Sequence, residues 1–242
     1  MTTKIRKMNG LVVYFDIYGF SDLLSKVSNN GRNLPLYPNF NSVEELSKEI
    51  LAIWEWISLE LNKPYVTTYL FSDCGFIVYP TTPEMLNSCT ADLTSLYSEF
   101  LRRGFFLRGG ISYGEVFTQN NFLTGKVVIE AVKLESISPG PFILLPYNIT
   151  NTLLKADKLI SEVNFKFQII ETKSKSGKIK AHLILPSDKG EFFNKLREYS
   201  EYYVENGPWE YGKFWHDTYE FVKTYLSTEV QDATQVTNTR KS

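Results

Sequence analysis

Residues 12–24 of the chain read VVYFDIYGFSDLL, and the rest of the domain is expected to be organised around this stretch. Its first half is apolar, β-branched and aromatic, which predicts a buried strand over residues 11–16. The strand ends in a carboxylate, Asp16. An acid at the end of a buried strand has two interpretations: it holds a cation, or it only caps the helix that follows.

A turn and a helix start come directly after this acid. Gly19 permits a tight turn, and Ser21 or Asp22 can cap a helix that begins at Leu23. The N–H groups at the start of a helix attract anions. A strand, an acid, a glycine turn and a helix start together are typical of a site for a metal ion with a phosphate.

A second acid occurs in the stretch YLFSDCGFIVY, residues 69–79. The sequence Ser-Asp-Cys-Gly lies between two apolar runs and predicts a hairpin turn, with Asp73 at a strand tip. Two acids at two strand ends, separated by a helical segment, can share a divalent cation. The alternative is that Asp73 is an ordinary turn residue.

Two further motifs follow along the chain: LRGGISYGEV over residues 107–116 and GKVVIEAVKLE over residues 125–135. Together with the two acidic segments, they resemble the motifs of class III nucleotidyl cyclases. The resemblance covers roughly residues 10–185. Within that family, the chain is most similar to the small bacterial pyrimidine cyclases of the Pycsar anti-phage system.

The expected fold is α+β. The order of predicted strands and helices is typical of a ferredoxin-like antiparallel sheet with helices on one face, and the resemblance implies the same sheet. In such cyclases two catalytic domains pair head to tail with the substrate between them. A single chain with one such domain is therefore expected to form a homodimer with two composite sites.

The resemblance implies attack of a ribose 3′-hydroxyl on the α-phosphorus of a nucleoside triphosphate, with release of pyrophosphate. Two Mg²⁺ or Mn²⁺ ions per site are implied, and oxygen ligands suit both metals. The positions that match the metal ligands are Asp16, the Ile17 carbonyl and Asp73. The matching phosphate-binding groups are the backbone N–H groups of Gly19, Phe20 and Ser21, with the side chain of Arg108.

Two positions depart from the family pattern. The family helix carries an Asn that orients the ribose and an Arg that stabilises the reacting phosphorus, and these positions are Ile129 and Lys133 here. Lys supplies a point charge without the two-pronged geometry of Arg. Lys133 is either catalytic or a plain surface residue, and a polar neighbour such as Glu130 is a candidate to replace the Asn.

Two other positions bear on the base. Adenine-specific relatives carry a Lys and an Asp where this chain has Thr67 and Phe122. A small hydroxyl with an apolar wall suits a smaller base, and a bulky wall excludes a purine. The resemblance therefore favours a pyrimidine nucleotide, with UTP ahead of CTP. The alternative is that the base is recognised elsewhere, for instance by Tyr37 in the segment 29–41.

Other functions are also compatible with the sequence. One is a purine cyclase that makes cyclic AMP or cyclic GMP, and another is an inactive nucleotide-binding module with the same fold. A diguanylate cyclase shares the two-metal chemistry, but its Gly-Gly-Asp/Glu-Glu-Phe signature is absent. A non-enzymatic interaction module built on the C-terminal aromatic residues is a further alternative.

Composition sets the remaining expectations. The 242 residues carry a net charge of −1, which argues against a broad nucleic-acid surface, and no apolar run is long enough to cross a membrane. Two cysteines, Cys74 and Cys89, and no signal peptide favour a reducing cytoplasm. We expect a catalytic domain over residues 1–186, aromatic-rich helices over 187–226, and a flexible tail over 227–242.

Overall fold

A computed structural model describes the chain in two compact units, residues 1–187 and residues 188–242. The described residues are 5–28, 40–61, 63, 66–80, 83–156, 169–174, 177–206, 213, 215–221 and 224. The segment 29–39, which includes Tyr37, and the predicted tail 227–242 lie outside them. None of the helices described is both long enough and apolar enough to pass through a bilayer.

The first unit is built on one mostly antiparallel sheet, as predicted. Its elements are β1 (Arg6–Ile17), α1 (Phe20–Ser28), α2 (Val43–Glu60), β2 (Thr67–Phe71), β3 (Cys74–Pro80), α3 (Pro83–Arg102), β4 (Leu107–Gln119), β5 (Phe122–Thr124), α4 (Lys126–Ser136), β6 (Ile143–Pro146), α5 (Tyr147–Ala156), β7 (Ile169–Ser174) and β8 (Gly177–Ile184). The strand order is β2-β3-β1-β4-β6-β8-β7, with β5 paired to β4. Only the β4–β6 pair is parallel among the strand pairs described.

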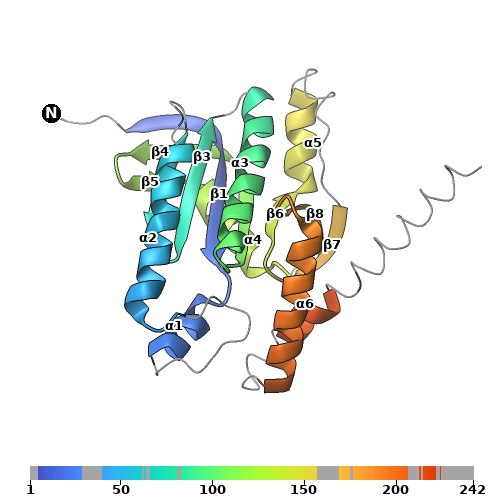
Figure 1. The fold of residues 1–242 in the computed structure, drawn as a ribbon. Coiled ribbons are helices and arrows are strands. Elements are labelled where there is room, and N and C mark those ends of the chain that lie inside the picture. The colour runs from blue at the N-terminus through green and yellow to red at the C-terminus, as the bar shows by residue number, and fades with distance from the viewer. Residues whose placement is uncertain are drawn as a thin grey trace, which may run out of the picture. The chain divides into compact units, whose positions relative to one another are not determined.

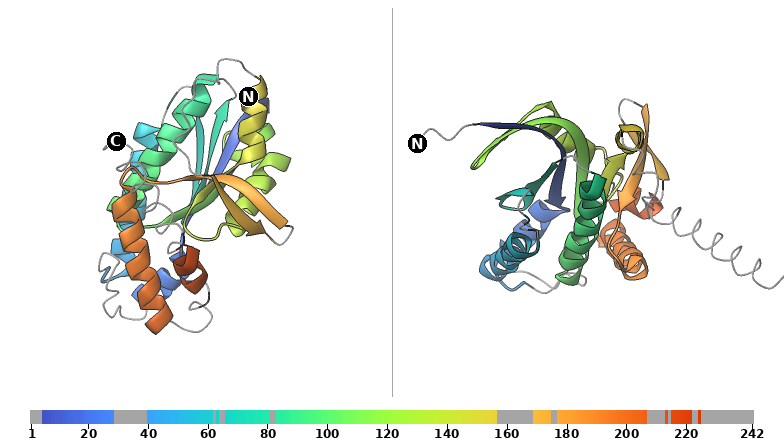
Figure 2. Two further views of the ribbon diagram at one scale, coloured as in Figure 1. Left: turned by 90° about the vertical axis from the view of Figure 1, so that its right-hand side faces the viewer. Right: turned by 90° about the horizontal axis from the view of Figure 1, so that it is seen from above.

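Helices cover both faces of this sheet. On one face Phe15 makes edge contacts with Trp54 of α2 and Phe100 of α3, with ring centroids 6.0 and 6.1 Å apart. These two helices lie side by side over the strands (Figure 1; Figure 2, right). On the other face Val12 belongs to a buried cluster with Ala131 of α4.

The prediction of helices on one face is therefore correct for α2 and α3 but incomplete, because α4 packs on the opposite side. The physical reason lies in β1, where the run from Leu11 to Val13 is buried on both faces. Side chains alternate between the two faces of a strand, so a continuous apolar run needs cover on each side.

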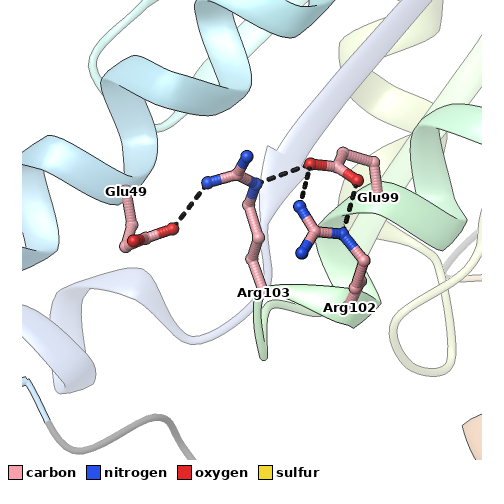
Figure 3. Close-up of polar contacts among 4 residues, drawn as sticks. All are labelled: Glu49, Glu99, Arg102 and Arg103. Atoms are coloured by element: carbon pink, nitrogen blue, oxygen red, sulfur yellow. Dashed lines mark hydrogen bonds and ion pairs between the residues drawn. The ribbon is translucent and has the colours of Figure 1, made fainter.

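An ion-pair network also joins α2 to the end of α3 (Figure 3). The guanidinium of Arg103 contacts Glu49 of α2 through Nη1 and Glu99 of α3 through Nε, each at 2.6 Å. Arg102 forms a further pair with Glu99, at 2.7 Å. Glu99 is therefore shared by two arginines, and Arg103 bridges the two helices.

The second unit contains α6 (Lys189–Asn206) and further helical residues up to 224. Its aromatic content is confirmed in the structure. The rings of Tyr199 and Tyr203 lie 4.5 and 4.9 Å from that of Trp215, and the Tyr203–Trp215 pair is stacked. These three rings pack against one another within the unit.

Candidate active site

The first predicted metal ligand, Asp16, lies on the central strand of the site. β1 pairs with β3 on one side and β4 on the other, so Asp16 is opposite both Cys74 and Arg108. Its side chain is only 15% exposed. Burial raises the pKa of Asp16 to about 6; Arg108 opposes this shift, and the charges of Asp73 and Glu135 add to it.

The second predicted ligand, Asp73, lies in the turn between β2 and β3. Ser72 before it adopts a left-handed conformation with φ of 38°, which closes the hairpin. The N–H of Ile17 donates to the Asp73 carbonyl at 3.0 Å. This bond places the turn beside the end of β1, so the two acids lie at the same corner of the sheet.

The predicted phosphate-binding turn follows directly. Gly19 has φ of +77°, which favours glycine, and its carbonyl accepts the first helical bond from the Leu23 N–H at 3.1 Å. Helix α1 therefore starts at Phe20, earlier than predicted, and Ser21 lies inside the first turn instead of capping it. N–H groups in the first turn of a helix have no acceptor within that helix, so those of Phe20 and Ser21 suit an anion.

Arg108 lies between two carboxylates. Its Nη2 is 3.2 Å from the Asp16 Oδ2, and its Nε forms an ion pair with the Glu135 Oε1 of α4. The guanidinium also lies over the Tyr18 ring, 5.6 Å from the centroid. Arg108 was predicted as a phosphate contact, and in the structure it is the counter-ion of Asp16, the predicted metal ligand.

Glu135 was not predicted as a site residue. It is buried together with Val127 and Ala131 on one face of α4, at the i, i+4, i+8 positions. A carboxylate on the apolar stripe of a helix is the signal that identifies it, because buried charges need a partner. Burial raises the pKa of Glu135, and Arg108 opposes that shift.

The two positions of α4 that differ from the family pattern, Ile129 and Lys133, both face solvent. The side chain of Ile129 is 58% exposed, and Lys133 is also exposed. Lys133 has no ion-pair partner within the described part of the chain. Glu130, the proposed replacement for the ribose-orienting Asn, instead accepts a hydrogen bond from Ser112 at 2.9 Å and pairs with Lys126. The described residues show no ion pair between Lys133 and either Asp16 or Asp73.

The two candidate base-recognising residues lie on two strands that do not pair with each other, β2 and β5. Thr67 begins β2 and is half-buried, while Phe122 begins β5 and is 49% exposed. The hydroxyl of Tyr69 donates to the Phe122 carbonyl at 3.3 Å, which ties β2 to β5. Thr67 and Tyr69 are two positions apart on one strand, so they share the sheet face that α4 covers.

A cavity of about 550 Å³ opens beside Lys133. Its lining includes Ser112, Glu130, Lys133, Asn148 and Ile149. Its volume falls in the usual range for small-molecule pockets. Neither Asp16 nor Asp73 lines it, so the cavity and the acidic corner are separate features of one chain.

The acidic corner suits a divalent cation. Asp16, Asp73 and Glu135 carry three carboxylates against the single guanidinium of Arg108, and Asp16 and Glu135 are largely shielded from water. Carboxylate and backbone oxygens are the donors that Mg²⁺ and Mn²⁺ prefer. Within the described residues no group of three or more His, Cys, Asp or Glu side chains is placed to hold a metal. Asp16 and Asp73 therefore remain predicted ligands.

Two solved structures with a similar fold come from nucleotide cyclases. The catalytic core of a rhodopsin-guanylyl cyclase with converted specificity, in complex with ATPαS, matches at a TM-score of 0.52 and 16% identity, over 76% of this chain and 99% of that chain. A bacterial light-regulated adenylyl cyclase matches at 0.53 and 16%, over 76% of this chain and 53% of that chain. No protein-family model and no curated protein matches the sequence. At this identity the likeness establishes the fold alone.

Proposed function

We propose that this chain is a nucleotidyl cyclase that converts a pyrimidine nucleoside triphosphate into a 3′,5′-cyclic nucleotide and pyrophosphate. The observation that carries the proposal is the acidic corner: Asp16 and Asp73 meet at the end of the central strand, directly before the Gly19 turn. The fold it shares with cyclase domains supports the same reaction.

The residues divide the chemistry between them. Asp16, Asp73 and the Ile17 carbonyl would hold Mg²⁺ or Mn²⁺. When bound, these ions lower the pKa of the ribose 3′-hydroxyl and neutralise the leaving pyrophosphate. The N–H groups of Phe20 and Ser21, with that of Gly19, bind the phosphate oxygens and hold the α-phosphorus in line with the hydroxyl.

The site is completed by a second copy of the chain. Ile129 and Lys133 lie exposed on α4, and Lys133 borders the cavity of about 550 Å³. In a head-to-tail homodimer, Lys133 of one subunit supplies positive charge to the phosphates held by the other. A symmetric pair of this kind has two equivalent sites.

Thr67 and Phe122 favour a pyrimidine base. The exposed Phe122 ring offers a wall, and Thr67 offers one hydroxyl as donor and acceptor. The preference for UTP over CTP rests on the resemblance to the Pycsar cyclases. So does the biological role, which is synthesis of a second messenger in bacterial defence against phage.

A pyrophosphate-release assay tests the proposal. Purified protein with UTP and Mn²⁺ is expected to release pyrophosphate and cyclic UMP in equal amounts, and EDTA is expected to stop both. The Glu44→Gln variant, changed at an exposed position of α2, serves as the control and is expected to keep full activity. Tight UTP binding without pyrophosphate release identifies a nucleotide-binding module and contradicts the proposal.

A further inference from the structure

We infer that Glu135 is a positioning residue: it holds Arg108 in place when Asp16 gives up that ion pair for a divalent cation. The inference rests on the proposed function, because it assumes that Asp16 is a metal ligand. It assigns to Glu135 a role in setting the metal affinity of the site, without contact to the metal.

The geometry makes Arg108 a built-in competitor of the metal. The guanidinium Nη2 lies 3.2 Å from the Asp16 Oδ2, so Arg108 is the side-chain cation paired with this carboxylate. A divalent ion that binds Asp16 must displace that contact or share the carboxylate with it. Two cations at one carboxylate repel each other, and the repulsion is strong where water is largely excluded.

Glu135 provides the alternative partner. It contacts Arg108 through Nε, a different nitrogen from the Nη2 that contacts Asp16. Arg108 can therefore release Asp16 and still keep a counter-ion. Without Glu135 the release would leave a partly buried guanidinium without a carboxylate partner, which is unfavourable. Arg108 would then hold Asp16 more strongly.

Close packing fixes Glu135 at this point. A Cβ atom added at Gly110 of β4 would lie 2.3 Å from the Leu134 Cβ and 2.5 Å from the Ala131 carbonyl oxygen. Only glycine permits α4 to cross β4 so closely. The hydrogen bond from Ser112 to Glu130 holds the preceding turn of the helix on the same strand. This packing of α4 on β4 fixes the position of the Glu135 carboxylate beside Arg108.

The test is a double-mutant cycle on Mn²⁺ affinity, measured by electron paramagnetic resonance with the metal alone and no nucleotide. Asp16→Asn is expected to abolish the site and so identifies it. Glu135→Gln is expected to weaken Mn²⁺ binding roughly tenfold, the low end of the effect of losing an outer-shell partner. Arg108→Gln is expected to tighten binding. Adding Glu135→Gln to Arg108→Gln is expected to change the affinity less than about twofold, because the competitor is already gone.

A simple charge effect predicts a different pattern. If Glu135 acts only as a nearby negative charge, Glu135→Gln weakens Mn²⁺ binding equally with and without Arg108, and that result overturns the inference. Glu135→Asp provides a second, folded variant that keeps the charge and shortens the reach to Arg108. It is expected to weaken Mn²⁺ binding, and an affinity equal to wild type contradicts the inference.

Failure of this inference and failure of the proposed function are distinguishable. The affinity cycle requires no turnover, so it can succeed in a chain that makes no cyclic nucleotide. Conversely, a chain that cyclises UTP but shows equal effects of Glu135→Gln in both backgrounds retains the proposed function and loses the inference. Absence of an Asp16-dependent Mn²⁺ site contradicts both.

Discussion

The N–H of Ile17 donates to the carbonyl of Asp73 at 3.0 Å, and this bond fastens the β2–β3 turn to the end of the central strand. It acts between backbone groups, so it survives substitution of either side chain. The acidic corner is therefore held together by the backbone, independently of the two carboxylates. Variants of these carboxylates can be interpreted as losses of ligands from a folded site.

We expect Asp16→Asn and Asp73→Asn each to lower cyclisation at least ~1,000-fold, because a catalytic metal ion contributes several kcal/mol to transition-state stabilisation. Circular dichroism and thermal melting are expected to show that both variants stay folded. Glu44→Gln, an exposed carboxylate on α2, is the matched control and should retain activity. Near wild-type turnover in either aspartate variant would rule out the two-carboxylate metal site.

A mixing experiment tests the composite dimer. Asp16→Ala lacks a metal ligand and Lys133→Ala lacks the charge supplied by the partner, so each homodimer is expected to be inactive. A heterodimer of the two has one site with both residues intact and one with neither. Exchange between subunits carrying different tags should be confirmed first by pull-down. Activity is then expected to rise to at most about half that of the wild type per heterodimer. Confirmed exchange with no return of activity would contradict the shared site or the role of Lys133.

Base preference can be shifted at two positions. Thr67→Lys with Phe122→Asp installs the pair carried by adenine-specific relatives, on strands that Tyr69 already ties together. We expect the ratio of ATP to UTP turnover to rise, because a hydrogen-bonding edge replaces an apolar wall. The measurement is a competition with equimolar nucleotides. Predominant conversion of ATP or GTP by the unaltered protein would overturn the pyrimidine assignment and leave the cyclase proposal standing.

The stability of the α2–α3 layer is expected to depend on Arg103 (Figure 3). Arg103→Gln removes its contacts with Glu49 and Glu99, and we expect the free energy of unfolding in urea to fall by about 1 kcal/mol at pH 7. Lys48→Gln, which breaks only an exposed pair with Glu44, is the control and should change it by less than about 0.5 kcal/mol.

The same network gives a pH dependence with a definite sign. Hydrogen bonds from Arg102 and Arg103 hold the pKa of Glu99 below its ordinary value of 4.5. A carboxyl group with a lowered folded-state pKa stabilises the fold above its unfolded pKa, and this contribution disappears as the pH falls through the folded pKa. The difference between wild type and Arg103→Gln is therefore expected to shrink between about pH 5 and pH 3. A difference that grows on acidification would contradict this assignment.

The turns that could be predicted from the sequence are set by residues only a few positions apart. The hairpin that carries Asp73 depends on turn residues, which act within a few positions. The start of α1 was predicted too late, because the carbonyl of Gly19 begins the helix where Ser21 seemed the better cap.

Contacts between distant segments could not be predicted in the same way. The pair between Arg108 and Glu135 depends on how α4 crosses β4, and that crossing is set by tertiary packing at Gly110. The proposed contact of Lys133 lies on a second subunit, so motifs within one chain could not reveal it. Sequence motifs indicate which residues carry the chemistry, but packing determines which of them meet.

Product identification by mass spectrometry tests the central claim most directly. The folded protein is incubated with equimolar UTP, CTP, ATP and GTP in the presence of Mn²⁺, alongside Asp16→Asn. We predict 3′,5′-cyclic UMP as the main product, with pyrophosphate in equal amount, and neither product from the variant. A folded, Mn²⁺-binding protein that forms no cyclic nucleotide from any of the four substrates would contradict the account.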